Sequence, residues 1–136
     1  MTATIDALKP GQSATYERTV TDEDIRRFAE LSGDDNPVHL DEAFAAATRF
    51  KGRIAHGMLA ASFISTVVGT KLPGYGAIYV SQSLRFRAPV RIGDTVETTA
   101  TVAGVDVERK RVTMRTVCRV GGTVVVDGEA ELLVPG

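Results

Sequence analysis

The chain has 136 residues, with 16 Lys and Arg against 17 Asp and Glu and no Trp, and its formal net charge is −1. This length supports one core, so we expect a single domain over residues 1–136. The balanced charge, without a basic run, argues against nucleic acid as a partner. No segment has the length and apolarity of a signal peptide or a membrane span, which predicts a cytoplasmic protein that binds no membrane.

The first predicted elements are a short strand over residues 13–20 and a helix that follows it. Thr21 can cap this helix, the three acidic residues after it suit the positive first turn, and Gly33 can end it. The apolar residues of the helix recur at helical spacing, which indicates packing against a core rather than a ligand site. They are Ile25, Phe28, Ala29 and Leu31.

The segment after this helix, residues 34–39, reads D-D-N-P-V-H and contains one of only two histidines. Pro37 fixes its own φ, lacks an N–H and pushes the preceding residue toward extended backbone, so the segment should form a rigid bend. A carboxylate and an imidazole on such a bend can converge on one water molecule, which indicates acid/base chemistry by Asp34 and His39. The alternative is structural: Asp34 or Asp35 caps a turn, and His39 is an ordinary loop residue.

Asp41 can cap a second short helix that runs to Ala47, and residues 49–54 form a polar connection. The next predicted helix, over residues 56–69, is apolar around nearly its whole circumference and about 20 Å long, so other elements must wrap it. It begins at Gly57, where the free N–H groups of the first turn can hold a developing oxyanion. Plain packing is the simpler explanation of this glycine.

From residue 78 onward, apolar and polar residues alternate with a period of two. This pattern predicts strands over residues 78–86, 95–102, 112–120 and 124–134, with a two-residue hairpin at Gly121-Gly122. Cys118 lies on the apolar face of its strand and has no disulfide partner, so we expect a small core residue rather than a reactive thiol.

Consecutive strands with short turns form an antiparallel meander. An apolar helix upstream of such a sheet indicates an α+β protein with the hot-dog architecture, in which the antiparallel sheet wraps a long central helix.

Three segments, Gly33–Asp41, Ile54–Leu59 and Gln82–Val90, resemble the MaoC-like hydratases. Within that family the chain is most similar to the short, single-hot-dog (R)-specific enoyl-CoA hydratases of polyhydroxyalkanoate synthesis. The similarity extends from Pro10 to Val134, and the combination of D-x-N-P-x-H with H-G-M is quite specific.

The resemblance implies a homodimer with the two sheets side by side and with active sites at the dimer interface. Asp34 and His39 match the catalytic pair of the family, and Gly57 matches the position whose backbone N–H polarises the thioester carbonyl. Four further positions match supporting or substrate-binding residues of the family. They are Asn36, His56, Ser65 and Val68.

Among these four, Asn36 helps to shape the bend, and Val68 is expected to help set the acyl chain length. Ser65 matches a serine close to the catalytic pair, although its hydroxyl could equally bond to the helix backbone. Asp35 stands where relatives vary and is given no role.

The implied reaction is the reversible addition of water to the C2–C3 double bond of a trans-2-enoyl-CoA, which yields (3R)-hydroxyacyl-CoA. Asp34 and His39 hold the water; one of them takes its proton as oxygen attacks C3, and a proton is delivered to C2 on the same face. Coenzyme A is part of the substrate, so we expect no separate cofactor.

Several alternatives share the fold or the substrate. A (3R)-hydroxyacyl dehydratase of fatty-acid synthesis that acts on acyl carrier protein is the nearest, because some of these enzymes share the D-x-N-P-x-H pattern. A hot-dog thioesterase is less well supported, because many carry a catalytic carboxylate on the central helix, and residues 57–70 contain none. A non-catalytic acyl-CoA-binding protein has no reason to keep Asp34, His39 and Gly57 together.

Two further sets of residues have side chains that can bind ions or phosphates. A metal site built from Asp34, His39 and His56 matches no established ligand spacing, so we expect no metal. Four cations could meet the phosphates of coenzyme A, although solvated strand edges explain them as well. They are Lys71, Arg85, Arg87 and Arg91.

Overall fold

The computed structural model describes residues 4–135, so residues 1–3 and 136 of the expected domain lie outside the description. Its helices and antiparallel strands confirm the α+β class. A short 3₁₀ helix, η1 (Ile5–Ala7), comes first. The α-helices are α1 (Asp22–Ser32), α2 (Pro37–Leu40), α3 (Glu42–Ala46) and α4 (Gly57–Thr70). The strands are β1 (Ser13–Thr19), β2 (Ile78–Gln82), β3 (Arg85–Phe86), β4 (Thr95–Asp106), β5 (Arg111–Val120) and β6 (Thr123–Leu133).

The strands form one antiparallel sheet in the order β1-β4-β5-β6-β2, and β3 also pairs with β6. The run from β4 to β6 is the expected meander. Gly121 and Gly122 connect β5 to β6, where Val120 pairs with Thr123, and Gly121 has a φ of 58°. The hairpin prediction is confirmed, because this positive φ is one that glycine adopts without strain.

The prediction of one continuous strand over residues 78–86 is wrong. Residues 83 and 84 separate β2 from β3, and a register shift occurs between Tyr79 and Ser81. At the break, a Cβ added to Gly128 of β6 would lie 1.8 Å from the Ser83 carbonyl oxygen. The missing side chain of Gly128 therefore permits the close approach of the two backbones at this point.

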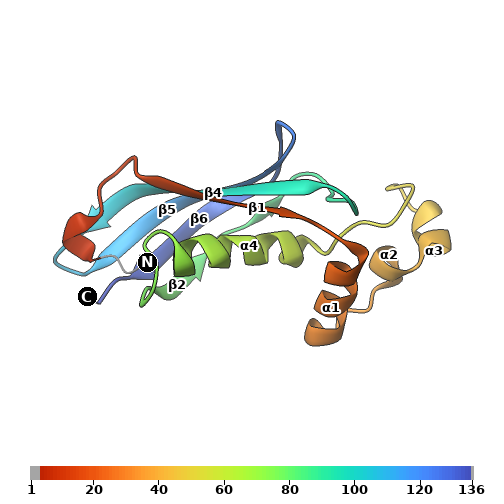
Figure 1. The fold of residues 1–136 in the computed structure, drawn as a ribbon, viewed down its shortest axis with the longest axis horizontal. Helices are drawn as coiled ribbons and strands as arrows, with labels where there is room; N and C mark the ends of the chain where they lie inside the picture. The colour runs from red at the N-terminus through yellow and green to blue at the C-terminus, as the bar shows by residue number, and fades with distance from the viewer. Residues whose placement is uncertain (1–3, 136) are drawn as a thin grey trace.

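Helix α4 lies along one face of the sheet, as Figure 1 shows. Its buried residues pack into the main core with inward-facing residues of β4, β5 and β6. From α4, the core contains Leu59, Ala60, Phe63, Ile64, Val67 and Val68. Cys118 is fully buried in the same core, and its Sγ donates a weak hydrogen bond to the Ala60 carbonyl oxygen at 3.7 Å. This layout is the predicted hot-dog fold, with Cys118 as a core residue.

The sheet wraps α4 on one side, and the other side is not covered within one chain. Met58 is 54% exposed there, and Ser62 and Ser65 are also exposed. One side of α4 is therefore open to another molecule.

Helix α1 begins and ends where the sequence predicts. Thr21 Oγ1 accepts a hydrogen bond from the Asp24 N–H at 3.1 Å, the Asp24 carboxylate accepts one from the Thr21 N–H at 3.2 Å, and Gly33 ends the helix with a φ of 81°. The prediction that Leu31 faces the core is wrong, because its side chain is 88% exposed. Six residues after Ile25, Leu31 lies about 240° around the helix and leaves the buried stripe.

Helices α1, α2 and α3 gather beyond the N-terminal end of α4, away from the end of the molecule where the chain termini lie (Figure 1). The Asp41 side chain caps α3 by accepting from the Phe44 N–H at 3.0 Å, as predicted, although α3 ends at Ala46. Among residues 4–135, no helix combines the length and the apolarity needed to cross a membrane.

Candidate active site

Asp34 lies in the link between α1 and α2, directly after the glycine that ends α1. Its N–H donates to Ser32 Oγ at 3.2 Å, and its Oδ1 accepts from the Asn36 N–H at 3.2 Å. These bonds to neighbouring residues form a local turn of the kind that aspartate favours. The side chain is exposed in the single chain, so a small molecule can reach its carboxylate.

Helix α2 begins directly after this turn. Asn36 Oδ1 accepts from the Val38 N–H at 3.1 Å and caps the helix, and Pro37 occupies the first helical position. Asn36 therefore shapes the bend as expected, while Pro37 also starts the short helix that presents His39.

His39 is 8% exposed, and its Nδ1 lies 2.8 Å from the Ile54 carbonyl oxygen. A carbonyl oxygen only accepts hydrogen bonds, so Nδ1 carries the proton and Nε2 keeps its lone pair in the neutral ring. Burial lowers the pKa of His39 below its ordinary value of 6.5, and the bond to Ile54 opposes this effect only in part. At neutral pH the ring can therefore accept a proton at Nε2.

Arg53 fixes the backbone around His39. Its Nε donates to the His39 carbonyl oxygen at 2.7 Å, its Nη2 donates to Asp22 Oδ1 at 2.6 Å, and its N–H donates to Glu42 Oε2 at 3.3 Å. The Arg53 side chain thus ties the end of α2 to the start of α1, and the Arg53 backbone N–H binds the Glu42 carboxylate at the start of α3. The sequence predicts only a polar connection around Arg53, because a single loop arginine carries no signal of partners so far apart in the chain.

His56 brings the catalytic candidates together. Its ring is 2% exposed, and its Nε2 lies 2.9 Å from the Asp34 carbonyl oxygen. The ring stacks on His39 with centroids 3.8 Å apart and planes inclined by 27°, and it also packs against Phe28. Side-chain atoms of Asp34, His39 and His56 lie within 4.8 Å of one another. Asp34 and His39 therefore meet at one place, and the donor types there are also those of a metal site.

Helix α4 starts at Gly57, directly after His56. The His56 side chain makes no capping hydrogen bond, and the Leu59 N–H donates to the His56 carbonyl oxygen at 3.0 Å, so the N–H of Gly57 is left without a side-chain cap. A Cβ at Gly57 would lie 2.7 and 2.8 Å from two ring atoms of Phe86. Close packing against Phe86 is therefore one reason for a glycine at this position, independently of any role of its backbone N–H.

A hollow of about 420 Å³ opens beside the first turn of α4 and touches the site through His56 and Gly57. Most of its lining is apolar, and two arginines border it. The side chains that border it include Arg49, Phe50, Met58, Phe86 and Arg87. Arg49 and Phe50 were not identified from the sequence, because nothing in a loop pattern shows which side chains will face a cavity. We call this space the α4 hollow.

The remaining predicted site residues lie farther along α4. The helical rise places Ser65 about 12 Å from Gly57. Ser65 is exposed on the open side of the helix, Val68 is 1% exposed in the core, and neither lines the α4 hollow. The roles of Ser65 and Val68 stay predictions, and one chain does not bring Ser65 to the catalytic pair.

The four cations considered for phosphate binding have different surroundings. Arg87 borders the α4 hollow and pairs with Asp127 at 2.9 Å. Arg91 donates to the Phe50 carbonyl oxygen at 2.5 Å, Arg85 lies outside the hollow, and Lys71 follows the end of α4 opposite to Gly57. Of these four, Arg87 is the one placed beside the site.

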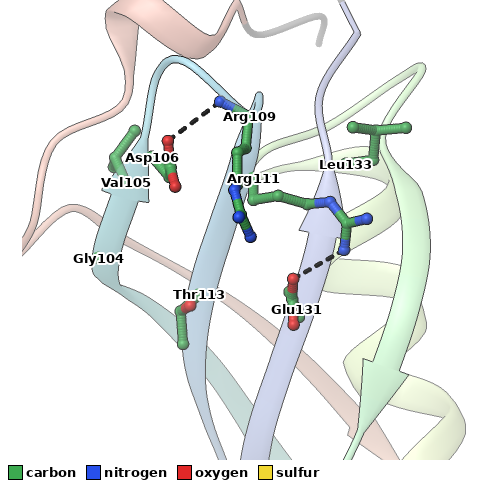
Figure 2. Close-up of a pocket in the computed structure, with 8 residues that line it drawn as sticks. All are labelled: Gly104, Val105, Asp106, Arg109, Arg111, Thr113, Glu131 and Leu133. Carbon is green, nitrogen blue, oxygen red and sulfur yellow. Dashed lines mark hydrogen bonds and ion pairs between the residues drawn. The ribbon is translucent and has the colours of Figure 1, made fainter.

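A larger cleft of about 720 Å³ lies at the far end of the sheet, among β4, β5 and β6 (Figure 2). Arg111 pairs there with Glu131 at 2.7 Å, and Asp106 Oδ1 accepts from the Arg109 N–H at 3.0 Å. The side chains of the ion pair are 38% and 42% exposed, so solvent screens their charges. We call this space the distal cleft; despite its size, no imidazole or free helix end borders it.

The fold and the site together define a hot-dog protein with an aspartate and a histidine close together at the N-terminus of its central helix. Comparisons with known proteins identify the family. The model of the MaoC-like domain matches residues 6–123. The chain is 59% identical over 128 residues to the (R)-specific enoyl-CoA hydratase of Rhodospirillum rubrum, which covers 94% of this chain and 89% of that protein.

Two more relatives agree with this match. The 3-hydroxybutyryl-CoA dehydratase of Methylorubrum extorquens is 51% identical over 128 residues, which covers 94% of this chain and 82% of that protein. The solved structure of the (R)-hydratase from Aeromonas caviae involved in PHA biosynthesis has a TM-score of 0.92 and 42% identity, over 95% of this chain and 98% of that chain. The chain belongs to the MaoC-like family.

Proposed function

We propose that this protein is an (R)-specific enoyl-CoA hydratase, which adds water reversibly to trans-2-enoyl-CoA and forms (3R)-hydroxyacyl-CoA. The observation that carries the proposal is the meeting of Asp34, His39 and the N-terminus of α4 at one place. The two relatives with 59% and 51% identity are named for hydration of an enoyl-CoA and for dehydration of a hydroxyacyl-CoA. These names describe the two directions of one reaction.

In the proposed mechanism, Asp34 and His39 hold the attacking water between them. The proton fixed on His39 Nδ1 leaves Nε2 as one acceptor, and the Asp34 carboxylate supplies another. The water oxygen bonds to C3 as one of these groups takes a water proton, and the π electrons of the C2–C3 bond move toward the thioester oxygen. A proton then returns to C2 on the same face, and the thioester carbonyl forms again.

The negative charge that develops on the thioester oxygen needs a donor that is already in place. The N–H of Gly57 is proposed to supply it, with support from the partial positive charge of the α4 N-terminus. Removal of one such donor can cost on the order of 10²–10³ in kcat. The α4 hollow, which borders Gly57, would take the part of the substrate next to the thioester.

The test is to mix the protein with crotonyl-CoA and to follow the loss of the conjugated enoyl absorbance. Asp34→Asn and His39→Ala should each lower kcat by about 10²–10⁴-fold, because each removes a proton-transfer group. Asp35→Asn is the matched control, because it neutralises the neighbouring carboxylate and should keep the parent rate. Full activity in both the Asp34 and His39 variants would remove them from the mechanism.

The carrier of the acyl group is decided by a second measurement. We propose coenzyme A as the carrier, so kcat/KM for crotonyl-CoA should exceed that for crotonyl-acyl carrier protein. The reverse order would support the dehydratase of fatty-acid synthesis. The proposed proton transfers need no cofactor and no metal. The cytoplasmic location stays a prediction from the sequence.

The two edges of the sheet favour a homodimer that forms through β2. The β1 edge exposes polar side chains such as Thr15 and Glu17, whereas the β2 edge exposes Ile78 and Val80 at 51% and 45%. An apolar edge strand with free backbone groups is suited to strand pairing, and a symmetric pair closes as a dimer. We propose that two copies join their sheets at β2 and that the second copy helps to enclose the half-open α4 hollow.

Light scattering after size-exclusion chromatography tests this dimer. The parent should have about twice the chain mass of 14.5 kDa. Val80→Lys should give a monomer with reduced activity, because it places a charge on the pairing edge. Thr15→Lys on the β1 edge is the control and should remain dimeric. A monomeric parent with full activity would exclude the proposed role of the interface.

A further inference from the structure

His56 has no step of its own in the proposed reaction, although it is among the most buried polar residues of the described chain. Its ring is 2% exposed and lies between the end of α1, the His39 ring and the start of α4. Phe28 packs against it with ring centroids 4.8 Å apart. A buried imidazole with so many contacts is held in one orientation.

The hydrogen bonds of His56 determine which nitrogen carries its proton. The Asp34 carbonyl oxygen, 2.9 Å from Nε2, can only accept, so Nε2 must donate. The other nitrogen, Nδ1, is buried and has no hydrogen-bond partner among residues 4–135. A proton on Nδ1 would be a buried donor without an acceptor, which is unfavourable. The hydrogen bonds therefore favour the tautomer of His56 with its proton on Nε2.

His39 has the opposite arrangement. Its Nδ1 donates to the Ile54 carbonyl oxygen, so its free nitrogen is Nε2. The two rings stack at 3.8 Å, a distance at which two imidazolium ions would repel each other strongly. Opposite tautomers of the two rings satisfy both carbonyl groups and leave Nε2 of His39 free for water.

We propose that His56 is a positioning residue of the hydratase, in which the Nε2–H tautomer holds the Asp34 backbone and the His39 ring against the N-terminus of α4. The proposal rests on the proposed function. Because His56 immediately precedes Gly57, one side chain sets the separation between the acid/base pair and the oxyanion donor. Both must contact the same enoyl thioester, at C3 and at the thioester oxygen.

Two substitutions separate the hydrogen bond from the ring. His56→Phe keeps an aromatic ring for the stack on His39 but removes the N–H, whereas His56→Gln loses the ring and keeps an amide donor that can reach the Asp34 carbonyl oxygen. Misplacement of catalytic groups by about 1 Å can cost about 10²-fold. We expect His56→Phe to lower kcat for crotonyl-CoA by about 10²-fold with KM changed by less than about threefold, and His56→Gln to recover about tenfold of that loss.

Val67→Ala is the matched control for stability. Val67 is also fully buried on α4, but it lies about 15 Å from Gly57 by the helical rise. This variant should lower the unfolding free energy and keep kcat. If Val67→Ala loses kcat as His56→Phe does, or if His56→Phe keeps the parent kcat, the positioning role is wrong.

The tautomers are read directly from long-range ¹H–¹⁵N NMR spectra of the parent protein. We expect the Nδ1–H form for His39 and the Nε2–H form for His56, and a changed His39 signal in His56→Phe. An Nδ1–H form of His56 would overturn the proposal. A parent that is inactive toward both thioester carriers would refute the proposed function instead, and the NMR result would still decide whether His56 orients His39.

Discussion

The α4 hollow and the distal cleft lie at opposite ends of the sheet and differ in what surrounds them. The distal cleft is larger, about 720 Å³ against about 420 Å³, but Arg111 and Glu131 in it are partly exposed and pair with each other. The α4 hollow is smaller, and it borders a buried imidazole and the free N–H groups of a helix start.

A buried polar atom without a partner in the described chain, His56 Nδ1, therefore distinguishes the α4 hollow from the distal cleft better than volume does. Arg111 and Glu131 in the distal cleft are already paired and screened by solvent, so a ligand there would gain little from them. Beside the α4 hollow, Nε2 of His39 is left free by the bond at Nδ1, and no side chain caps the N-terminus of α4. Substitutions at the two ends should therefore have very unequal effects on activity.

The largest effect we expect in this comparison comes from Gly57→Pro. Proline is tolerated at the first position of a helix, so α4 should form, but the N–H proposed to hold the oxyanion is removed. We expect kcat for crotonyl-CoA to fall by about 10²–10³-fold. Gly57→Ala is the control, because it introduces the same crowding against Phe86 and keeps the N–H. Equal losses in the two variants would assign the effect to crowding.

The next largest effect on activity is expected from low pH, which protonates His39. His39 must be neutral to accept a proton, and burial lowers its pKa below 6.5. The kcat/KM for crotonyl-CoA should therefore fall in acid with a midpoint below pH 6.5, and below that midpoint it should approach about a tenfold loss per pH unit. A rate profile measured between about pH 4 and 8 checks this, and an acid midpoint above pH 6.5 would contradict it.

The same pKa shift has a consequence for stability with a definite sign. Between the folded pKa of His39 and 6.5, the unfolded chain binds a proton that the folded chain does not. The unfolding free energy therefore falls as the pH drops from 6.5 through the folded pKa. In urea titrations, His39→Ala should lack this component of the pH dependence.

Substitution in the distal cleft should have a small effect. Arg111→Ala breaks the pair with Glu131, which is exposed and therefore contributes about 0–1 kcal/mol to stability. We expect kcat to remain that of the parent and the urea midpoint to move slightly. A large loss of kcat in this variant would show that the distal cleft takes part in the reaction.

Metal removal is expected to leave kcat unchanged. Asp34, His39 and His56 provide the donor types of a zinc site, but proton transfer by the first two requires no ion. Dialysis against EDTA should leave kcat unchanged. Activity that is lost on dialysis and restored by Zn²⁺ would establish the metal alternative.

Features set by neighbouring residues were predictable from the sequence. Some features depend only on contacts between residues that are close in the sequence, so local chemistry determines them. They are the Thr21–Asp24 capping box, Gly33 at the end of α1 and the Gly121-Gly122 turn. Asp34 and His39 belong to this class, because one short bend carries both.

Features set by distant residues were not predictable. The break between β2 and β3 depends on Gly128, about 45 residues farther along the chain. Arg53 contacts Asp22 and the His39 backbone, and the orientation of His56 depends on the Asp34 carbonyl group. Such contacts exist only after the chain has folded, and no local pattern indicates them.

Residues 34–56, which contain the site, take no part in the sheet, and they are held by the bonds of His39 and His56 to carbonyl groups, by the Arg53–Asp22 pair and by the backbone bond from the Ala55 N–H to the Val90 carbonyl oxygen. Such a segment can open locally while the sheet remains intact. On warming, the enzyme should consequently lose activity at a temperature below the melting temperature of its sheet. Amide hydrogens of α2 should exchange with solvent faster than those of β5.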